Sequence, residues 1–150
     1  MKVRRAKIAD VKSIHKLING FAKNEEMLPR ALNDLYENVR DFFIYEESGE
    51  LRGICALRVV WEDLAEVRSL AVRREDQGRG VGTALLKRCL RDARELGIKR
   101  VFALTYLPEF FEKMGFKEID KVKLPHKIWG DCLKCPKFPE CNEHAVIIIL

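Results

Sequence analysis

No apolar run in this chain of 150 residues approaches the roughly 18–20 residues that a membrane-spanning helix needs, so no membrane segment is predicted. The sequence also lacks internal repeats, low-complexity segments and linkers. Its amino end, Met1 to Arg5, leads into an alternating segment without a signal-peptide apolar core, which favours a cytoplasmic protein. Hydrophobic residues make up 47% of the chain, which excludes disorder. We therefore expect a single domain over residues 1–150.

A large excess of either charge is absent too. The chain carries 28 Lys and Arg residues against 23 Asp and Glu residues, a net charge of +5. Such a mild positive field favours small anionic ligands. Because the basic residues are scattered and interleaved with acidic ones, we do not expect the protein to bind nucleic acid.

Two common phosphate-binding motifs are missing. No run has the P-loop spacing of Gly, four residues and then Gly-Lys-Ser/Thr. A dinucleotide fingerprint, Gly-x-Gly-x-x-Gly, begins at Gly78 and Gly80 but fails at Thr83. These absences leave other phosphate-binding loops to be considered.

A glycine-rich run is nevertheless present over residues 77–83, with the sequence Gln-Gly-Arg-Gly-Val-Gly-Thr. It follows a strand-like segment at 65–72 and opens a helix-like segment at 81–96, which stops at Gly97. Such a turn offers unpaired backbone N–H groups and the positive end of a helix dipole, and glycine lets the backbone close on a phosphate. The run predicts a pyrophosphate-binding loop, with a plain strand-to-helix turn as the alternative.

The remaining pattern predicts an α/β chain with short connections. A first strand is expected at 2–8, and Asp10 is expected to cap a helix whose apolar face runs from Val11 to Phe21. A second helix is expected to begin near Pro29 and to end near Val39. The other expected elements are a hairpin of 41–47 and 51–61, strands at 65–72, 100–105, 116–121 and 145–150, and helices at 81–96 and 109–114.

The spacing Gln77-x-x-Gly80-x-Gly82 resembles the acetyl-CoA signature of the GNAT superfamily of N-acetyltransferases. A narrower resemblance, to the acetyltransferase domain of N-acetylglutamate synthase in its short single-domain bacterial form, covers nearly the whole chain. The segments that carry it are 28–30, 66–72, 104–106, 110–116, 124–129 and 131–141. The resemblance implies a GNAT fold of class α/β (α+β), a mixed and mostly antiparallel sheet of about six or seven strands with about four helices.

The resemblance also implies a reaction, the transfer of acetyl from acetyl-CoA to the α-amino group of L-glutamate in arginine biosynthesis. The α-ammonium must lose a proton before it attacks, so a carboxylate or an ordered water is needed beside it. Glu66 matches the strand position of the general base in related enzymes, and on a strand it shares a face with Arg68. The alternative for Glu66 is an exposed carboxylate paired with Arg68.

An acceptor with two carboxylates calls for a fixed guanidinium, because Arg can bind a carboxylate through two parallel hydrogen bonds. Arg30 matches the substrate arginine of the synthases, Arg68 is the second candidate, and the backbones at Leu28 and Ser69 are candidates for amide contacts. The alternative for Arg30 is a solvated residue in the first turn of a helix.

For the cofactor, Leu70, Ala71 and Val72 are expected to offer strand-edge groups to the pantetheine arm. The pyrophosphate is expected to lie on the backbones of Gln77, Gly78, Arg79, Gly80, Val81, Gly82 and Thr83, with Arg79 adding charge. Many relatives place a Tyr acid where this chain has Phe111, which we count as a cofactor-side residue. Tyr106 is the nearest phenol in sequence and the candidate acid, although packing or catalysis by water alone are alternatives.

Five cysteines complete the set of candidates. Cys55 and Cys89 fall on element faces and are expected to be packed as small apolar residues. A structural zinc site or a reduced loop is predicted for the spacing Cys-x2-Cys-x5-Cys-x2-His within a Cys-rich insertion at about 122–143. Its ligands would be Cys132, Cys135, Cys141 and His144.

Three alternatives stay open: another small amine or amino acid as acceptor, a non-catalytic CoA-binding module, and a homodimer. Long-form synthases are inhibited by arginine through a further, kinase-like domain, a mode of regulation that we do not assume for this chain.

Overall fold

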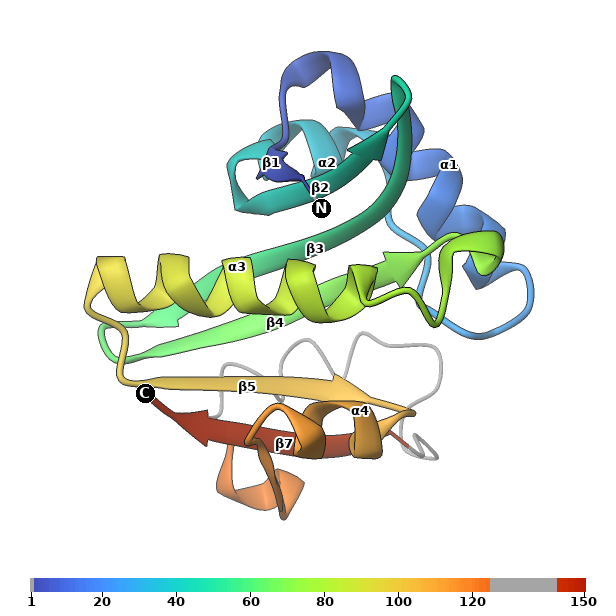
Figure 1. Ribbon diagram of the computed structural model, residues 1–150. Helices are drawn as coiled ribbons and strands as arrows, with labels where there is room; N and C mark the ends of the chain where they lie inside the picture. Colours follow the sequence, from blue (N-terminus) through green and yellow to red (C-terminus); the bar gives the residue numbers. More distant parts are fainter. Residues whose placement is uncertain (1, 125–142) are drawn as a thin grey trace.

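The computed structural model of the chain describes residues 2–124 and 143–150, which form a seven-stranded mixed sheet with helices on both faces (Figure 1). The strand order is β1-β2-β3-β4-β5-β7-β6, and β4 and β5 are the parallel pair among antiparallel neighbours. The strands are β1 Val3–Arg5, β2 Phe42–Glu47, β3 Glu50–Trp61, β4 Leu64–Val72, β5 Arg100–Thr105, β6 Lys117–Ile119 and β7 His144–Ile149. The α-helices are α1 Val11–Ala22, α2 Leu32–Glu37, α3 Val81–Leu96 and α4 Pro108–Lys113.

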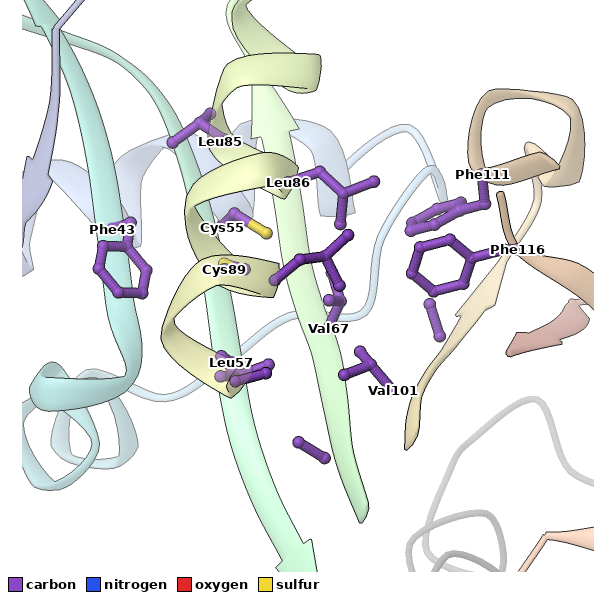
Figure 2. Close-up of a cluster of buried hydrophobic side chains, with 14 of the residues drawn as sticks. Phe43, Cys55, Leu57, Val67, Leu85, Leu86, Cys89, Val101, Phe111 and Phe116 are labelled. Atoms are coloured by element: carbon purple, nitrogen blue, oxygen red, sulfur yellow. The ribbon is translucent and has the colours of Figure 1, made fainter. Parts of the chain in front are cut away.

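Alternating side chains of β2 and β3 supply two cores, one on each face of the sheet. Phe42 and Ile54 pack with α1 and α2, whereas Phe43 and Cys55 pack with α3. Figure 2 shows the α3-side core, in which the side chains of Cys55 and Cys89 lie next to each other. The Cys55 thiol and burial both raise the pKa of the Cys89 thiol. Both cysteines are buried and reduced, as expected for small apolar core residues.

Helix α3 has the predicted bounds because its sequence marks both ends. Gly80 precedes it and Gly97 follows it, each with a φ of 84° that favours glycine. The N–H of Ile98 donates to the carbonyl of Ala93 at 2.9 Å, which closes the helix in a Schellman arrangement.

The sequence-based bounds were less accurate at the amino end. α2 begins at Leu32 and not near Pro29, because Pro29 also suits the extended segment that leads into this helix. A short 3₁₀ turn, Ile8–Asp10, precedes α1, and the Asp10 carboxylate faces back to accept from the N–H of Lys7 at 2.7 Å. Asp10 therefore makes no side-chain cap for α1. The first strand is shorter than predicted, Val3–Arg5.

Two irregularities of β4 shape the middle of the sheet. β4 pairs with β5 only from Leu64 to Glu66, although β4 continues to Val72 and β5 to Thr105. Further along β4, two residues, Ser69 and Leu70, face one residue of β3, which is a β-bulge. The sheet therefore opens between β4 and β5 just beyond Glu66.

The bulge changes which side chains share a face of β4. Ser69 has a φ of 53°, in the left-handed region, and inserts one extra residue into the strand. As a result Val67 and Leu70, three positions apart, both pack in the α3-side core. Glu66 and Arg68 share the opposite face, where α1 and α2 lie.

Candidate active site

The glycine-rich run forms an open loop between β4 and α3. Gly78 and Gly80 have φ values of 80° and 84°, in the left-handed region that glycine tolerates. Within the described residues, no acceptor takes the backbone N–H groups of Gly78 through Thr83, and the first helical donor is Ala84, which bonds to Gly80. The side chain of Gln77 donates to the carbonyl of Val72 at 3.0 Å and fastens the loop to the end of β4. These donors suit a pyrophosphate.

Gly82 lies close to an aromatic side chain at the start of α3. A Cβ atom added at Gly82 would lie 3.5 Å from the ring of Phe110 and 3.8 Å from Val72. Phe111, the residue singled out from the sequence, is instead buried in the α3-side core and packs edge to face on Phe116 at 5.1 Å (Figure 2). Phe110 is thus the aromatic neighbour of the loop, and nothing in the sequence distinguishes the two.

Arg79 contributes to the loop in a manner that its sequence position did not indicate. Its guanidinium binds Asp76 at 2.6 Å and Glu47 at 3.2 Å, and this contact lowers the pKa of Glu47. The expectation that Arg79 adds charge at the pyrophosphate stays a prediction.

The residues predicted to contact the pantetheine arm lie in the second half of β4. Ala71 and Val72 pair with Ile54 and Gly53 of β3, so β3 occupies one edge of this part of β4. On the other edge, no strand of the described residues pairs with β4 beyond Glu66. An extended chain with backbone-like amides can add there.

Glu66 lies at the last paired position before the sheet opens. It is buried at 9% exposure, between Arg58 of β3 and Phe102 of β5 in the sheet register. Its Oε1 lies 3.7 Å from Nε of Arg68, so the predicted base and cation do share a face. A proton acceptor at this position would sit beside both the opening and the face that carries α2.

A polar pocket of about 260 Å³ lies on that face. The acceptor residues predicted from the sequence are brought together in and beside it, because Arg30 and Arg68 line it and Arg30 donates to Oγ of Ser69 at 3.3 Å. Leu28 lies in the extended segment before α2 and is 37% exposed. The complete lining is Arg30, Asp34, Asn38, Asp41, Ala56, Arg58 and Arg68.

Arg30 is held by three neighbouring side chains, and only 10% of its own side chain is exposed. Its Nε donates to Asp34 at 2.7 Å, its Nη1 to Ser69, and the guanidinium lies 5.3 Å from the centre of the Phe42 ring. The hydrogen bond from Arg30 lowers the pKa of Asp34, and Asn38 donates to the same carboxylate at 2.8 Å. The terminal N–H groups of Arg30 that remain can bind a substrate carboxylate in parallel.

Five lining residues were missed from the sequence, the polar Asp34, Asn38, Asp41 and Arg58 and the small apolar Ala56. The spacing of Arg30 and Asp34, four residues apart, was a usable signal, and the β3–β4 hairpin places Arg58 opposite Glu66. Burial raises the pKa of Asp41 against the opposing effect of Arg30, Arg58 and Arg68.

The other candidates are placed as follows. Tyr106 follows β5 directly, at the end of the strand that separates from β4. His144 begins β7, and its Nδ1 bonds to Glu118 of β6 at 2.5 Å. Cys132, Cys135 and Cys141 lie outside the described residues, and among those described no group of His, Cys, Asp and Glu could hold a metal. The zinc site stays a prediction without structural support.

No helix in the described part of the chain has the length and apolarity to cross a membrane.

Residues 8–116 match the family model described as the acetyltransferase (GNAT) family. An uncharacterized N-acetyltransferase of Chlorobaculum tepidum is 40% identical, over 97% of this chain and 94% of the relative. An amino-acid acetyltransferase of Mycobacterium tuberculosis is 38% identical, over 86% of this chain and 75% of the relative.

Solved structures show the same arrangement. A Mycobacterium tuberculosis protein in complex with CoA has a TM-score of 0.87 at 31% identity, with 100% of this chain and 99% of that chain covered. The N-acetylglutamate synthase of Neisseria gonorrhoeae, complexed with coenzyme A and N-acetyl-glutamate, has a TM-score of 0.91 at 30% identity. That match covers 99% of this chain and 35% of the synthase. The predicted fold class is confirmed.

Proposed function

The chain belongs to the acetyltransferase (GNAT) family, and on this premise we propose that it transfers the acetyl group of acetyl-CoA to the α-amino group of L-glutamate. The observation that carries the proposal is the pocket on the Glu66 face of β4, which three arginines line against two aspartates, so that positive charge is in excess. Guanidinium groups bind carboxylates in parallel and repel cations, so this pocket favours an acidic amino acid over a polyamine or an aminoglycoside. The names of the Mycobacterium and Neisseria relatives point to the same class of acceptor.

The proposed steps use residues on both sides of the sheet opening. Acetyl-CoA supplies an acyl thioester. The amides of Gly78 through Thr83 hold its pyrophosphate, and the free edge of β4 holds its arm. Arg30, with Arg68, binds the acceptor carboxylates and thereby presents the amine near Ser69. Glu66 accepts the ammonium proton, directly or through water.

The acetyl transfer itself forms one bond, breaks another and returns a proton to the leaving group. The freed amine forms a C–N bond with the acetyl carbon, and the C–S bond breaks to leave a thiolate. Tyr106 or water returns a proton to that sulfur, because Phe111 stands where many relatives have a Tyr. We also propose that the reaction serves arginine biosynthesis in the cytoplasm.

The first test is a screen of the twenty amino acids for CoA release. We expect saturable thiol release with L-glutamate and the highest kcat/KM for it. A higher value for another amino acid would reassign the acceptor. Binding of CoA without turnover of any amine would favour the second candidate, a CoA-binding module, which the buried Phe111 in place of the usual acid supports.

The second test concerns Arg30. We expect Arg30→Ala to raise the KM for glutamate by roughly tenfold to a hundredfold, the loss of a charge-assisted bond, and to leave the KM for acetyl-CoA unchanged. Arg91→Ala, which removes an exposed arginine of α3, controls for the change in net charge. Equal effects on both KM values would exclude Arg30 from the acceptor site.

A further inference from the structure

An ion network joins the proposed pyrophosphate loop to the β2–β3 hairpin. At its centre is Asp76, in the 3₁₀ turn before the loop, whose side chain is 1% exposed. Arg52 of β3 donates to both Asp76 oxygens, at 3.1 and 3.3 Å, and Arg79 of the loop donates at 2.6 Å. Glu47, at the end of β2, completes the network through Arg79. None of these contacts takes part in the proposed acetyl transfer.

Arg79 lies between two glycines of the loop. Gly78 and Gly80 both have positive φ and no side chain to restrain them. Its Nη1 donates to Asp76 and to Oε2 of Glu47 at 3.2 Å, while its Nη2 donates to Oε1 of Glu47 at 3.4 Å. The side chain therefore connects two segments that are more than thirty residues apart, as the separation of Arg79 and Glu47 by 32 positions shows.

The charges of the network are balanced without a ligand. Two guanidiniums, of Arg52 and Arg79, face two carboxylates, of Asp76 and Glu47, and Arg52 has a further contact with Glu50 at the edge of the network. To reach a phosphate, Arg79 would have to give up three hydrogen bonds and leave the buried Asp76 with Arg52 alone. Removing one partner from a buried charge is strongly unfavourable.

We propose that Arg79 is a positioning residue, anchored by Asp76 and Glu47, and not a ligand of the cofactor phosphates. It holds the loop in the conformation that keeps the N–H groups of Gly78 through Thr83 available. Affinity for the diphosphate then comes from these amides and from the positive end of α3. This inference concerns the cofactor side alone and does not depend on which amine is acetylated.

Calorimetric titration with CoA tests the proposal, because the two roles of Arg79 predict opposite signs. If Glu47 anchors Arg79, Glu47→Gln loosens the loop and weakens CoA binding, by about threefold to tenfold. If Arg79 is a phosphate ligand, the same change frees it and tightens binding. Glu50→Gln is the matched control, since Glu50 lies on the same hairpin and binds Arg52 and Arg73 but not Arg79. An effect of Glu47→Gln equal to this control, or a tighter complex, would overturn the proposal.

A double-mutant cycle gives an independent result with residues that are exposed enough to leave the fold intact. Arg79→Gln and the double variant Glu47→Gln/Arg79→Gln should bind CoA with equal affinity, because the anchor is already lost in the single variant. Additive losses would show that Glu47 affects CoA binding by a route other than Arg79 and would reject the anchoring role. Both measurements need no acceptor, so they stand even if glutamate is not the substrate.

Discussion

At the scale of single residues, Glu66 is the most informative side chain. A carboxylate at 9% exposure in the central strand of a sheet is unfavourable unless it has partners. Here Arg68 lies 3.7 Å away and Arg58 is opposite in the register. A buried carboxylate with cationic neighbours suits the proposed role of Glu66 as the general base.

We expect Glu66→Gln to lower kcat by about 10²- to 10⁴-fold, because the amide has the same shape but cannot accept the proton. The loss should be largest at low pH, where the acceptor amine is most fully protonated. Rates across roughly pH 6 to 9 measure this effect. Glu95→Gln, on the exposed side of α3, should follow the wild-type profile. An unchanged profile for Glu66→Gln would exclude it as the base.

Asp34 gives a pH-dependent prediction. Its pKa is lowered in the folded chain by the hydrogen bond from Arg30. A depressed carboxyl pKa contributes stability that is present above the unfolded-state pKa and is lost as pH falls through the folded-state value. Asp34→Asn should therefore lower the free energy of unfolding by roughly 0.5 kcal/mol at pH 7, a figure reduced for its exposure. The difference from wild type should disappear at low pH, where both side chains are neutral.

Urea unfolding at both pH values measures this difference. An equal loss at neutral and acid pH would indicate a packing effect of the substitution and contradict the electrostatic account. In the same variant the KM for glutamate should rise, since the neutral amide of Asn holds the Arg30 guanidinium less firmly than the carboxylate does.

At the scale of elements, the boundaries that the sequence marks chemically are the ones that could be predicted. α3 and β5 have the predicted bounds. For α3 the reason is that Gly80 and Gly97 interrupt the apolar pattern at both ends of the helix. The predicted start of α2 near Pro29 was wrong, because proline suits both a helix start and an extended segment. The bulge at Ser69 has no sequence signature, since serine is not the residue expected at positive φ.

The same limit applies to the site. The loop at 77–83, Glu66 and the two substrate arginines follow from motif and resemblance, whereas the pocket contributions of Asp41 and Arg58 depend on how β3, β4 and the turn after α2 meet. Contacts between distant segments leave no local pattern in the chain, so these residues could be found only in the structure.

Helix α3 begins with a glycine that should separate stability from cofactor binding. We expect Gly82→Ala to raise the free energy of unfolding by up to about 1 kcal/mol, the helix preference of alanine, since the added Cβ makes only ordinary contact with Phe110. It should also weaken CoA binding, because a methyl group intrudes where the backbone approaches the pyrophosphate.

Gly20→Ala in α1 is the matched control, because a Cβ there meets nothing within 4 Å. It should add similar stability and leave CoA affinity unchanged. Unaltered CoA affinity in Gly82→Ala would show that the pyrophosphate does not approach this turn. Thermal unfolding and calorimetry supply the two readouts.

At the scale of the whole molecule, the sheet opens between β4 and β5 beyond Glu66. The α3-side core spans the opening, joining β2 and β3 to α4 and β7 (Figure 2). The cofactor arm and the acceptor pocket lie on either side of the opened strand in the proposed complex. The opening in the sheet thus lets both substrates of the proposed reaction reach the same strand, β4.

Amide hydrogen exchange followed by mass spectrometry can map this opening. We expect acetyl-CoA to slow exchange in peptides over 67–72 and 77–83, whose N–H groups include donors without a carbonyl partner among the described residues. Peptides of β1 and β2 serve as the internal control and should not change. Protection spread evenly over the chain would indicate general tightening and would contradict a local binding mode.

The edge of β4 beyond Glu66, which no strand of residues 2–124 or 143–150 occupies, has one more consequence, for the protein without its cofactor. An unpaired strand is a template for any other extended chain, including another copy of itself. A pantetheine arm seated on it would act as a shield against such association. Cofactor-depleted preparations should therefore aggregate sooner than saturated ones, and added CoA should delay their aggregation although it supplies no acetyl group for turnover.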